Sequence, residues 1–315
     1  MIETWSNSRK LDLLTCTTDQ ELLQVFPGHK LESLKRRQRE FKKEKRFDPD
    51  RLFDTYEKRE TVKVSGLKDN TKILITSDYQ LPFADWKTVK AVEDFMADFQ
   101  PDIHVYNGDI MDCYSISTFT KNPTSKINLS EEFEMCRNLL DRHKRISPDT
   151  KVYFIAGNHE QRLIREIIHN SPELYGLKGD EEDEIISIPS LLGLPKRNVT
   201  YINYRSMLDI EGFIILHGYT SKANTAKFMY QRFLSSGCVG HTHDLSSYHV
   251  TGVNGSHGFY TIGCLCSLEP DWTVDPVPDW QQGFMYAVVM NNKLHPKLVH
   301  IYEDGFYAEG KFYKR

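Results

Sequence analysis

The chain has 315 residues, of which 39% are hydrophobic and 27% charged, so it can form a large buried core and wholesale disorder is excluded. The formal net charge of −4 excludes a protein that is a polycation as a whole, although local charge can still matter. The longest apolar runs are strand-sized and far short of the roughly 20 residues of a transmembrane helix, so we expect no membrane partner.

The first compositional zone, residues 1–65, is polar and helix-prone, and we interpret it as a small N-terminal helical arm. Thr18 and Glu21 have the spacing of a capping box, which predicts a helix over Asp19–Phe26. Pro27 and Gly28 end that helix. A second helix is expected from Leu31 to about Lys45, because its few apolar residues recur at helical spacing.

The second predicted helix is strongly basic. The segment Lys30–Arg46 contains nine basic and three acidic residues, a local net charge of +6. Two helices joined by a short turn, the second of them basic, suggest a helix-turn-helix arm that contacts DNA or RNA. The alternative is a solvated surface helix with i,i+4 ion pairs, such as Arg36 with Glu40.

The second zone, residues 66–315, alternates short apolar runs with helical patterns, and we interpret it as the catalytic domain. Helices are expected over Thr88–Phe99 and over Ser130–Ile146, where Ser-Glu-Glu looks like a cap. This order predicts an α/β fold, mixed with α+β character because the last third is richer in strands. The expected strands are Lys72–Ser77, Asp102–Asn107, Lys151–Ala156, Phe213–His217, Cys238–Gly240, Gly258–Ile262, Met285–Met290 and Leu298–Tyr302.

The cysteines and the N-terminal residues indicate the compartment. Six cysteines are present, with no Cys-x-x-Cys pair, which is too few for a disulfide scaffold. Residues 1–10 are polar and lack the apolar core of a signal peptide. We therefore expect a cytoplasmic protein with reduced thiols, most of them buried as small hydrophobic side chains. The cysteines are Cys16, Cys113, Cys136, Cys238, Cys264 and Cys266.

Polar side chains that can bind metals follow five of the expected strands. In α/β proteins these strand ends meet at one edge, where sites are built. Taken singly, an Asp after a strand is a common turn residue, and His217 could be a core histidine. Together they are harder to explain without a function. The five sequences are Ser77-Asp78-Tyr79-Gln80, Asn107-Gly108-Asp109-Ile110-Met111-Asp112, Gly157-Asn158-His159-Glu160, His217-Gly218 and Gly240-His241-Thr242-His243.

These side chains predict the kind of metal and the number of ions. Carboxylate and amide oxygens combined with imidazoles suit manganese, iron or zinc better than calcium. Seven ligands are too many for one transition metal with an open position, but they suit two ions bridged by one carboxylate. We therefore expect two divalent metal ions, manganese first, with iron, zinc or nickel as alternatives.

The order Asp-x-Gln, Gly-Asp-x-x-Asp, Gly-Asn-His-Glu, His-Gly, Gly-His-Thr-His resembles the calcineurin-like metallophosphoesterase family over about Lys72–Met290. The resemblance implies two β-sheets packed as a sandwich flanked by helices. It also implies a dinuclear metal centre at the sheet edge and hydrolysis of phosphomonoesters or phosphodiesters.

The resemblance further implies a role for each polar residue. Gln80 departs from the family pattern, because the commonest form has His at this position, and an amide oxygen is a harder donor than imidazole. The first metal would be bound by Asp78, Gln80 and His243, the second by Asn158, His217 and His241, with Asp109 bridging both, His159 protonating the leaving oxygen and Asp112 orienting His159.

The expected mechanism follows from these parts. Two cations acidify a bridging water to hydroxide, which attacks phosphorus in line with the leaving group while His159 donates a proton. Arg162 and Arg165 are candidates for gripping phosphate, or plain surface arginines. Tyr79 is expected at the entrance of the site. The loop Asp271–Gln282, with Trp272 and Trp280 among prolines, could shape a substrate groove.

The metal centre does not identify the substrate, but the basic arm favours a phosphodiesterase or nuclease that acts on nucleic acid. One alternative is a phosphomonoesterase acting on a small molecule, nucleotide or phosphoprotein. An alternative of another class is a DNA-binding or scaffold protein whose metal centre is catalytically weak because of Gln80.

Overall fold

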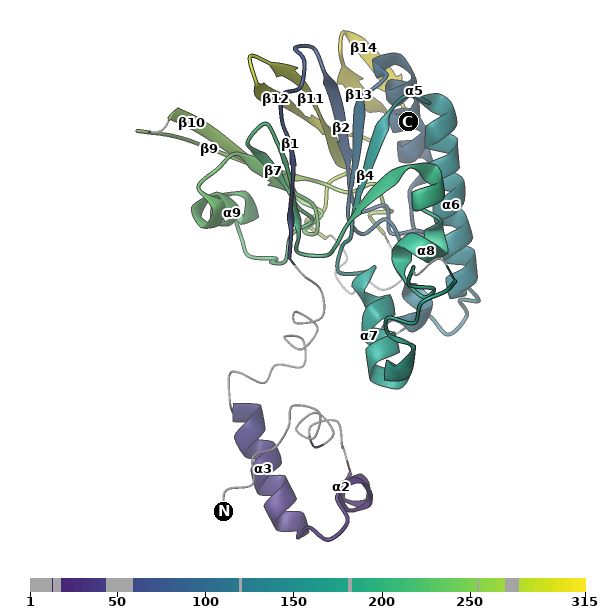
Figure 1. Cartoon of the computed structure of the whole chain (residues 1–315). Helices are drawn as coiled ribbons and strands as arrows, with labels where there is room; N and C mark the ends of the chain where they lie inside the picture. The colour runs from purple at the N-terminus through teal and green to yellow at the C-terminus, as the bar shows by residue number, and fades with distance from the viewer. Residues whose placement is uncertain are drawn as a thin grey trace. The chain divides into compact units, whose positions relative to one another are not determined.

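The computed structural model describes residues 13, 18–43, 59–118, 121–180, 183–253, 255–269 and 278–315, without the side chains of residues 41–43. The chain divides into two compact units, residues 1–58 and residues 59–315. Figure 1 shows the elements of both units. Each unit is described below by itself.

The smaller unit contains the two helices predicted for the arm, α2 (Asp19–Val25) and α3 (Leu31–Lys43). Thr18 Oγ1 accepts a hydrogen bond from Glu21 N at 3.2 Å, and a Glu21 side-chain oxygen accepts one from Thr18 N at 3.0 Å, so the predicted capping box is present. The helices share a small core. The continuation of the second helix to Lys45 lies outside the described residues. The buried side chains of this core are Leu13, Leu22, Phe26 and Leu34.

The larger unit begins earlier than the sequence analysis expected. Strand β1 (Thr61–Val64) was assigned to the arm by the boundary at residue 65, but it pairs in parallel with β6 (Met207–Ile210). Val62 and Val64 pack against the core of the larger unit. A four-residue strand needs a hydrogen-bonded partner, and its partner lies more than 140 residues along the chain, beyond the reach of local sequence patterns.

Two six-stranded mixed sheets form the centre of the larger unit, with a β13–β14 hairpin beside them. In spatial order, the first sheet contains β1, β6, β7 (Phe213–Ile215), β8 (Gly237–Val239), β10 (Gly255–Ile262) and β9 (Leu245–Gly252). The second sheet contains β12 (Lys293–His300), β11 (Gly283–Met290), β2 (Lys72–Thr76), β3 (Ile103–Asn107), β4 (Lys151–Ile155) and β5 (Val199–Ile202). The hairpin is β13 (Gly305–Ala308) with β14 (Lys311–Lys314).

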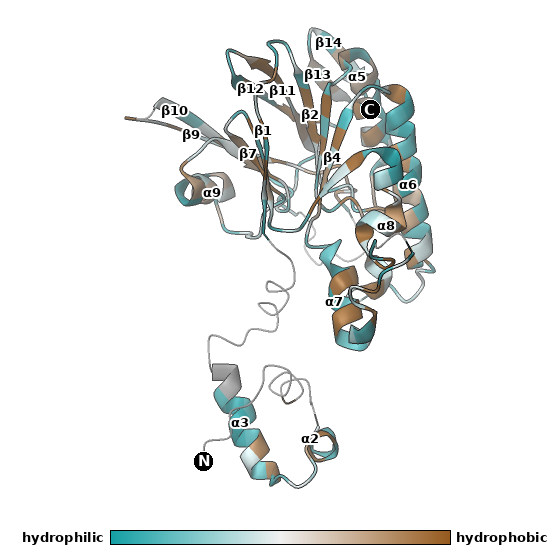
Figure 2. Ribbon diagram, in the orientation of Figure 1, coloured by the Kyte–Doolittle hydropathy of each residue, from teal (hydrophilic) through white to brown (hydrophobic). Residues whose placement is uncertain are grey.

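Side-chain alternation along the central strands divides the hydrophobic core into layers. On β2, Ile73 and Ile75 contribute to the core between the two sheets, whereas Leu74 points to the core beneath the helices. Figure 2 shows hydrophobic residues along β2 and β4. Because both faces of these strands are covered, they consist of continuous apolar runs, and this is why they were legible in the sequence.

Helices cover the outer faces of the sandwich (Figure 1). Helices α5 (Trp86–Phe99) and α6 (Leu129–Ile146) pack on the second sheet through Phe95, Met96 and Leu139, among others. Helix α9 (Thr225–Phe233) packs on the first sheet through Met229. The predicted sandwich of two β-sheets flanked by helices is therefore confirmed. The shorter helices are α7 (Gln161–Asn170), α8 (Ile188–Leu192) and three 3₁₀ turns, η1 (Tyr114–Ile116), η2 (Pro172–Leu174) and η3 (Pro195–Arg197).

The cap predicted for α6 is wrong. The helix is capped by Asn128, not by Ser130, which lies in the first turn. Asn128 Oδ1 accepts a hydrogen bond from Glu131 N at 3.1 Å, and Glu131 Oε2 accepts one from Asn128 N at 3.2 Å. Asn and Ser are both good caps, so the three-residue spacing to the glutamate decides the position.

Parallel strands bring several loops to one edge of the sandwich. Strands β2, β3 and β4 run parallel to one another in the second sheet, and β7 runs parallel to β8 in the first. Their carboxyl ends carry the five polar sequences identified above. No helix in the described part of the chain is both long and apolar enough to cross a membrane.

Candidate metal centre

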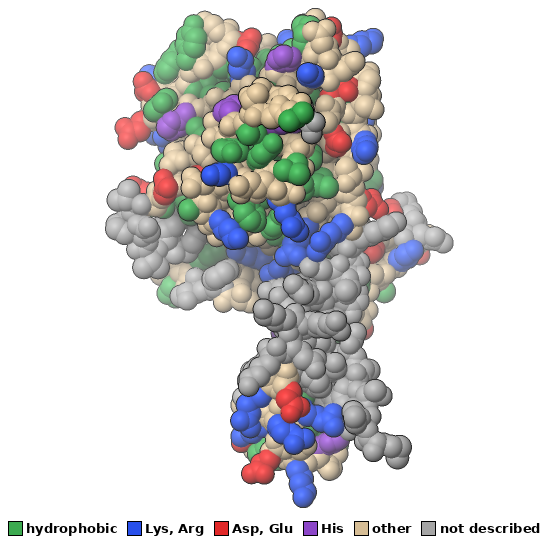
Figure 3. All heavy atoms as spheres, turned by 90° about the vertical axis from the view of Figure 1, so that its left-hand side faces the viewer, with side chains coloured by type: hydrophobic (Ala, Val, Ile, Leu, Met, Phe, Trp, Pro, Cys, Tyr) green, Lys and Arg blue, Asp and Glu red, His purple; other side chains and the backbone are tan. Residues whose placement is uncertain are grey.

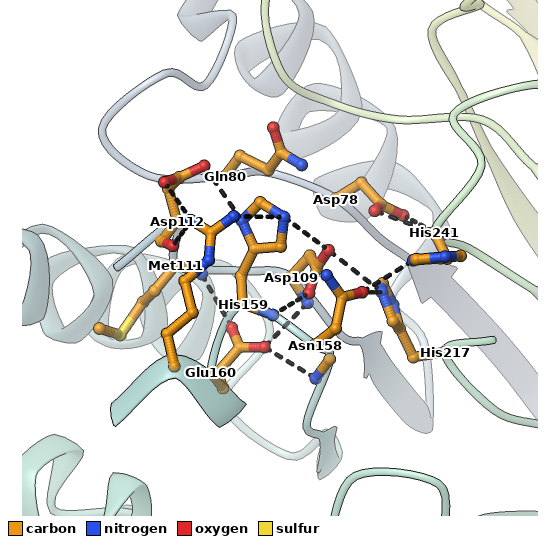
Figure 4. Close-up of polar contacts among 12 residues, drawn as sticks. Asp78, Gln80, Asp109, Met111, Asp112, Asn158, His159, Glu160, His217 and His241 are labelled. Atoms are coloured by element: carbon orange, nitrogen blue, oxygen red, sulfur yellow. Dashed lines mark hydrogen bonds and ion pairs between the residues drawn. The ribbon is translucent and has the colours of Figure 1, made fainter. Parts of the chain in front are cut away.

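The nine residues predicted for the site lie together in one connected network at this edge. Figure 4 labels all of them except His243. Most of them are withdrawn from solvent: the exposed fraction is 0% for Asp78, 1% for Asp109 and His217, and 5% for His243. The nine are Asp78 and Gln80 after β2, Asp109 and Asp112 after β3, Asn158 and His159 after β4, His217 after β7, and His241 and His243 after β8.

One half of the network consists of the residues predicted to bind the second metal. Asn158 Oδ1 lies 3.1 Å from His217 Nε2 and 2.7 Å from His241 Nδ1. His217 Nε2 also lies 3.1 Å from Asp109 Oδ2. His217 Nδ1 lies 2.8 Å from the carbonyl oxygen of Asn107, which can only accept a hydrogen bond, so Nδ1 carries the proton and Nε2 is left as the donor atom for a cation.

The other half consists of the residues predicted to bind the first metal. Asp78 Oδ1 and Gln80 Nε2 lie 3.2 Å and 3.1 Å from His243 Nε2. The amide oxygen of Gln80 is buried and has no hydrogen-bond partner among the described residues. A buried oxygen without a partner is costly in an apolar interior, and a cation is a partner that a half-turn of the amide would reach. The side chains present therefore fit a divalent cation.

The charges of the site depend on one another. Burial opposes ionisation of Asp109, but the nearby His159 and His217 outweigh it and hold the pKa of that carboxyl well below its usual range. Burial likewise opposes a charged His217, yet Asp109 raises the pKa of this imidazole to about 10. A cation that binds at His217 Nε2 therefore displaces a proton from this atom. Burial and the neighbouring His217 lower the pKa of His241 to about 4. The pocket therefore concentrates negative charge on Asp109, which suits a bridging ligand.

Two glycines allow the loops to approach the predicted ligands closely. A Cβ atom at Gly157 would lie 2.0 Å from Asp109 Oδ1, and one at Gly240 would lie 2.4 Å from Asp78 Oδ2. A side chain at either position would therefore clash with the carboxylate. Asp78 is held there by hydrogen bonds from Ser77 Oγ and from His241 N, the latter at 3.0 Å.

Five of the seven predicted ligands have a left-handed backbone conformation, with φ values between 47° and 70°. Non-glycine residues adopt this region at a cost of roughly 1–2 kcal/mol each. Such strain clusters at functional sites, where the surrounding structure holds it. The five residues are Asp78, Gln80, Asp109, His241 and His243.

His159 and Asp112 have the geometry expected of an oriented proton donor. His159 Nδ1 lies 3.0 Å from Asp112 Oδ2, and His159 Nε2 faces Asp109 Oδ2 at 3.6 Å. Arg162, on α7, donates from Nη1 to Asp112 Oδ1 at 2.8 Å and to its carbonyl oxygen at 2.6 Å, while Nη2 lies 3.3 Å from His159 Nε2. Arg162 thus fixes the residue that orients His159.

The network borders a pocket of about 280 Å³. Tyr114 and Trp280 form part of its wall, and the Trp280 ring lies 4.4 Å from the His243 ring. Arg162 lines the pocket, whereas Arg165 is not among the described residues that do so. The expectation for Tyr79 is wrong, because Tyr79 is buried in the core beneath the helices. Trp272 lies outside the described residues.

Sequence reasoning gave no role to Glu160, which the structure places beneath the site. Its Oε2 accepts hydrogen bonds from Asp109 N at 3.0 Å and Gly157 N at 2.7 Å, and its Oε1 accepts from Ile110 N at 2.8 Å and Met111 N at 2.9 Å. Burial and the nearby Asp109 raise the pKa of Glu160 to about 7. Its position after Gly-Asn-His was visible in the sequence, but its partners are backbone groups of two loops.

Two cysteines beside the site were also expected only as buried hydrophobic residues. Cys266 Sγ lies 3.9 Å from His243 Nδ1, whereas Gln80 contacts the other ring nitrogen, Nε2. Cys264 also belongs to this cluster, in which the ligand atoms lie within 4.8 Å of one another. The five described cysteines are free and buried, as predicted, and Cys16 lies outside the described residues.

Comparisons of sequence and of fold find several similar proteins. The chain is 29% identical over 253 residues to the Gene 54 protein of Mycobacterium phage D29, covering 76% of this chain and 97% of the relative. It is 26% identical over 272 residues to the Gene 54 protein of Mycobacterium phage L5, with coverages of 77% and 98%. Vacuolar Protein Sorting 29 from Cryptosporidium parvum is 15% identical with a TM-score of 0.42, covering 78% of this chain and 95% of that one.

The family comparison is more specific. The model of the calcineurin-like phosphoesterase family matches residues 71–249, which is more than half of the chain and includes all nine residues of the predicted site. This family implies a dinuclear centre of divalent metal ions and the hydrolysis of phosphoesters. The chain belongs to the calcineurin-like phosphoesterase family and is a metal-dependent phosphoesterase.

Proposed function

We propose that this protein is a phosphodiesterase that cleaves nucleic acid at a dinuclear metal centre. The proposal rests on one observation: seven side chains that can bind metals lie in the same network as the His159–Asp112 pair and Arg162. Two divalent cations bound there would supply the Lewis acidity needed to activate water and to offset the charge of the phosphate. The donor set favours manganese, with iron, zinc or nickel as alternatives.

The protein's own side chains account for the proton and for orientation. Asp112 accepts the Nδ1 hydrogen of His159 and so leaves Nε2 as the position from which a proton can reach the leaving oxygen. The guanidinium of Arg162 holds Asp112 and also borders the pocket, where it can grip a phosphate oxygen. Burial of Asp109 and Asp78 removes water from the charged centre and strengthens these interactions.

The basic helix α3 supports a polyanionic substrate. Lys30, Arg36 and Arg39 are exposed. The ion pair between Arg36 and Glu40 spans 3.6 Å, and both side chains are more than half exposed, so it neutralises the helix weakly. A basic helix carried on the same chain raises the local concentration of nucleic acid around the catalytic unit.

The size of the pocket also supports a second candidate function, that of a phosphomonoesterase. A volume of about 280 Å³ also suits a small phosphomonoester, which would not need the basic helix. In a further alternative, the unusual Gln80 weakens the first metal site and the chain serves mainly as a nucleic-acid-binding or scaffold protein.

Turnover by the full chain with Mn²⁺ tests these candidates. The substrates are single-stranded DNA, duplex DNA, RNA and the p-nitrophenyl mono- and diesters. We expect the parent protein to cleave at least one of the nucleic acids. In the triple variant Lys30→Ala, Arg36→Ala, Arg39→Ala, this cleavage should be abolished at moderate salt, whereas hydrolysis of the diester should persist. Glu32→Ala, which removes an exposed acid from the same helix, is the matched control. Monoester turnover alone would support the second candidate, and bound metal without any hydrolysis would support the third.

A further inference from the structure

The segment that forms α9 and the β9–β10 hairpin has an unusual distribution of charge. Residues 212–268 contain Lys222, Lys227, Arg232 and, as their single acid, Asp244, although 27% of the whole chain is charged. Asp244 Oδ2 accepts a hydrogen bond from Thr261 Oγ1 at 3.0 Å within this segment. The three bases are exposed. Three bases and one acid give this segment a net charge of +2 in a chain whose net charge is −4, so it can attract an anion.

Aromatic rings lie among these bases. Lys222 Nζ lies 4.3 Å from the centre of the Phe228 ring, and Lys227 Nζ lies 5.8 Å from the centre of the Tyr248 ring. The Tyr230 ring lies 5.7 Å from that of Tyr248 and 5.9 Å from that of His257. Tyr248, Tyr230 and His257 thus form a row of three neighbouring rings from hairpin to helix, and Lys227 lies over the first of them.

This surface is joined to the metal centre by a short loop. His217, a predicted ligand, follows strand β7, and Tyr219, two residues later, is 38% exposed. Lys222 follows in the same exposed loop. In Figure 3, which looks onto this side, Lys and Arg side chains of the larger unit gather below a field of hydrophobic and uncharged side chains. We call Tyr219, Lys222, Lys227, Tyr230, Tyr248 and His257 the α9 face.

We propose that the α9 face is a track along which a single strand of nucleic acid reaches the metal centre. The inference rests on the proposed function and names its substrate more narrowly. Lysines would follow the phosphates, and the tyrosine rings would stack with bases. A duplex hides its base faces and would leave the rings unused. An acidic peptide would satisfy the lysines but would not use the row of rings.

The experiment uses the full chain with the basic helix α3 intact. One variant, Lys222→Glu with Lys227→Glu, removes the cations, and a second, Tyr248→Ala, removes a ring. The matched control is Lys293→Glu with Lys297→Glu, two exposed lysines on β12 in the other sheet. The measurements are binding and cleavage of a fluorescent single-stranded oligodeoxynucleotide, its duplex and the corresponding RNA, over a range of salt concentrations. Hydrolysis of bis(p-nitrophenyl) phosphate reports on the catalytic centre alone.

We expect both α9 variants to lower kcat/KM for the single strand by about tenfold or more, with diester hydrolysis unchanged. The double lysine variant should also reduce the slope of log affinity against log salt by about 1.4, or about 0.7 for each phosphate that a lysine no longer neutralises. The β12 control should behave like the parent protein.

Three results would overturn the inference. The first is that the α9 variants cleave the single strand as well as the β12 control does. The second is that the parent protein binds and cleaves the duplex as well as the single strand. The third is that polyglutamate displaces the bound oligonucleotide at a lower concentration than an unlabelled strand does. The proposed function fails separately, if the parent protein hydrolyses the diester but no nucleic acid.

Discussion

Glu160 accepts a hydrogen bond from the backbone N–H of Asp109 at 3.0 Å, so the predicted bridging ligand is positioned through its main chain as well as its side chain. The same carboxylate binds three further N–H groups in the loops after β3 and β4. It therefore holds together two loops that carry predicted ligands. A carboxylate is needed because both oxygens must accept, and an amide has only one accepting oxygen.

The substitution Glu160→Gln should therefore separate these loops. Its NH₂ group would face two backbone donors, and we expect a loss of about 3 kcal/mol in the free energy of unfolding. Metal content should fall as well, because Asp109 loses its support. Urea unfolding and metal analysis measure the two effects. Glu173→Gln, at an exposed position in η2, is the control and should change neither. A fully stable, metal-loaded Glu160→Gln protein would disprove the positioning role.

His159 should matter most when the leaving group is poor. With His159→Ala we expect turnover of an alkyl phosphodiester to fall roughly 10²–10⁴-fold, and that of a p-nitrophenyl ester much less, because p-nitrophenolate leaves without a proton. Metal content should be retained. Asp109→Ala, in contrast, should lose the metals. Equal losses on both esters would show that His159 does not act as the proton donor.

Gln80 should set the metal preference of the first site. Replacing its amide oxygen by an imidazole, in Gln80→His, should shift the preference from manganese toward zinc by roughly an order of magnitude. The measurement is the metal content after reconstitution of the apoprotein with equal concentrations of both ions. Gln80→Ala, which offers no donor, should leave the first site weakly filled. An unchanged manganese-to-zinc ratio in Gln80→His would show that this residue is not a ligand.

Glu132 should make stability depend on pH. Its burial raises the pKa of this carboxyl to about 7, although the N–H groups of Tyr114 and Ser115 donate to it at 3.1 Å and 3.3 Å. In the unfolded chain the pKa returns to its ordinary value of 4.5. Between these two values the folded protein binds more protons, so the free energy of unfolding falls as pH rises, by at most about 3 kcal/mol.

The test compares the metal-free parent with Glu132→Gln by urea unfolding at about pH 5 and about pH 8. The glutamine variant should lack this part of the pH dependence, so the difference between the two proteins should change between the two pH values. Glu134→Gln, on the exposed side of the same helix, should follow the parent. A constant difference would mean that Glu132 titrates normally.

The buried parallel strands and the polar residues after them were predictable from the sequence because both signals are local. Strand β2 is an uninterrupted apolar run, and Asp78 follows directly where the chain leaves the core. Strand β9, Leu245–Gly252, was missed, because its serines, histidine and threonine show no apolar alternation. Its strand conformation comes from pairing with β10 along its whole length. Strand β1 was missed for a different reason: it has only four residues, and its partner β6 is distant in the sequence.

Within the site, the residues that could be predicted are those whose chemistry is in the side chain. The meeting of Asp109 with His217 was predictable because each follows the carboxyl end of a buried strand, β3 or β7. The structural role of Glu160 could not be predicted, because its four hydrogen-bond partners are backbone N–H groups whose positions depend on the folded loops. The burial of Tyr79 could not be predicted either. It lies between two predicted ligands that both have a left-handed backbone, and its side chain lies in the core.

The left-handed backbone of the ligand residues also predicts how this protein would respond to selection. At Asp78, Gln80 and Asp109, glycine would adopt the observed φ without strain and would remove a donor atom at the same time. Selection for heat resistance alone should therefore favour mutations that inactivate the enzyme. Thermostable variants should instead be sought away from this edge, with phosphoesterase activity kept as a second criterion throughout the screen.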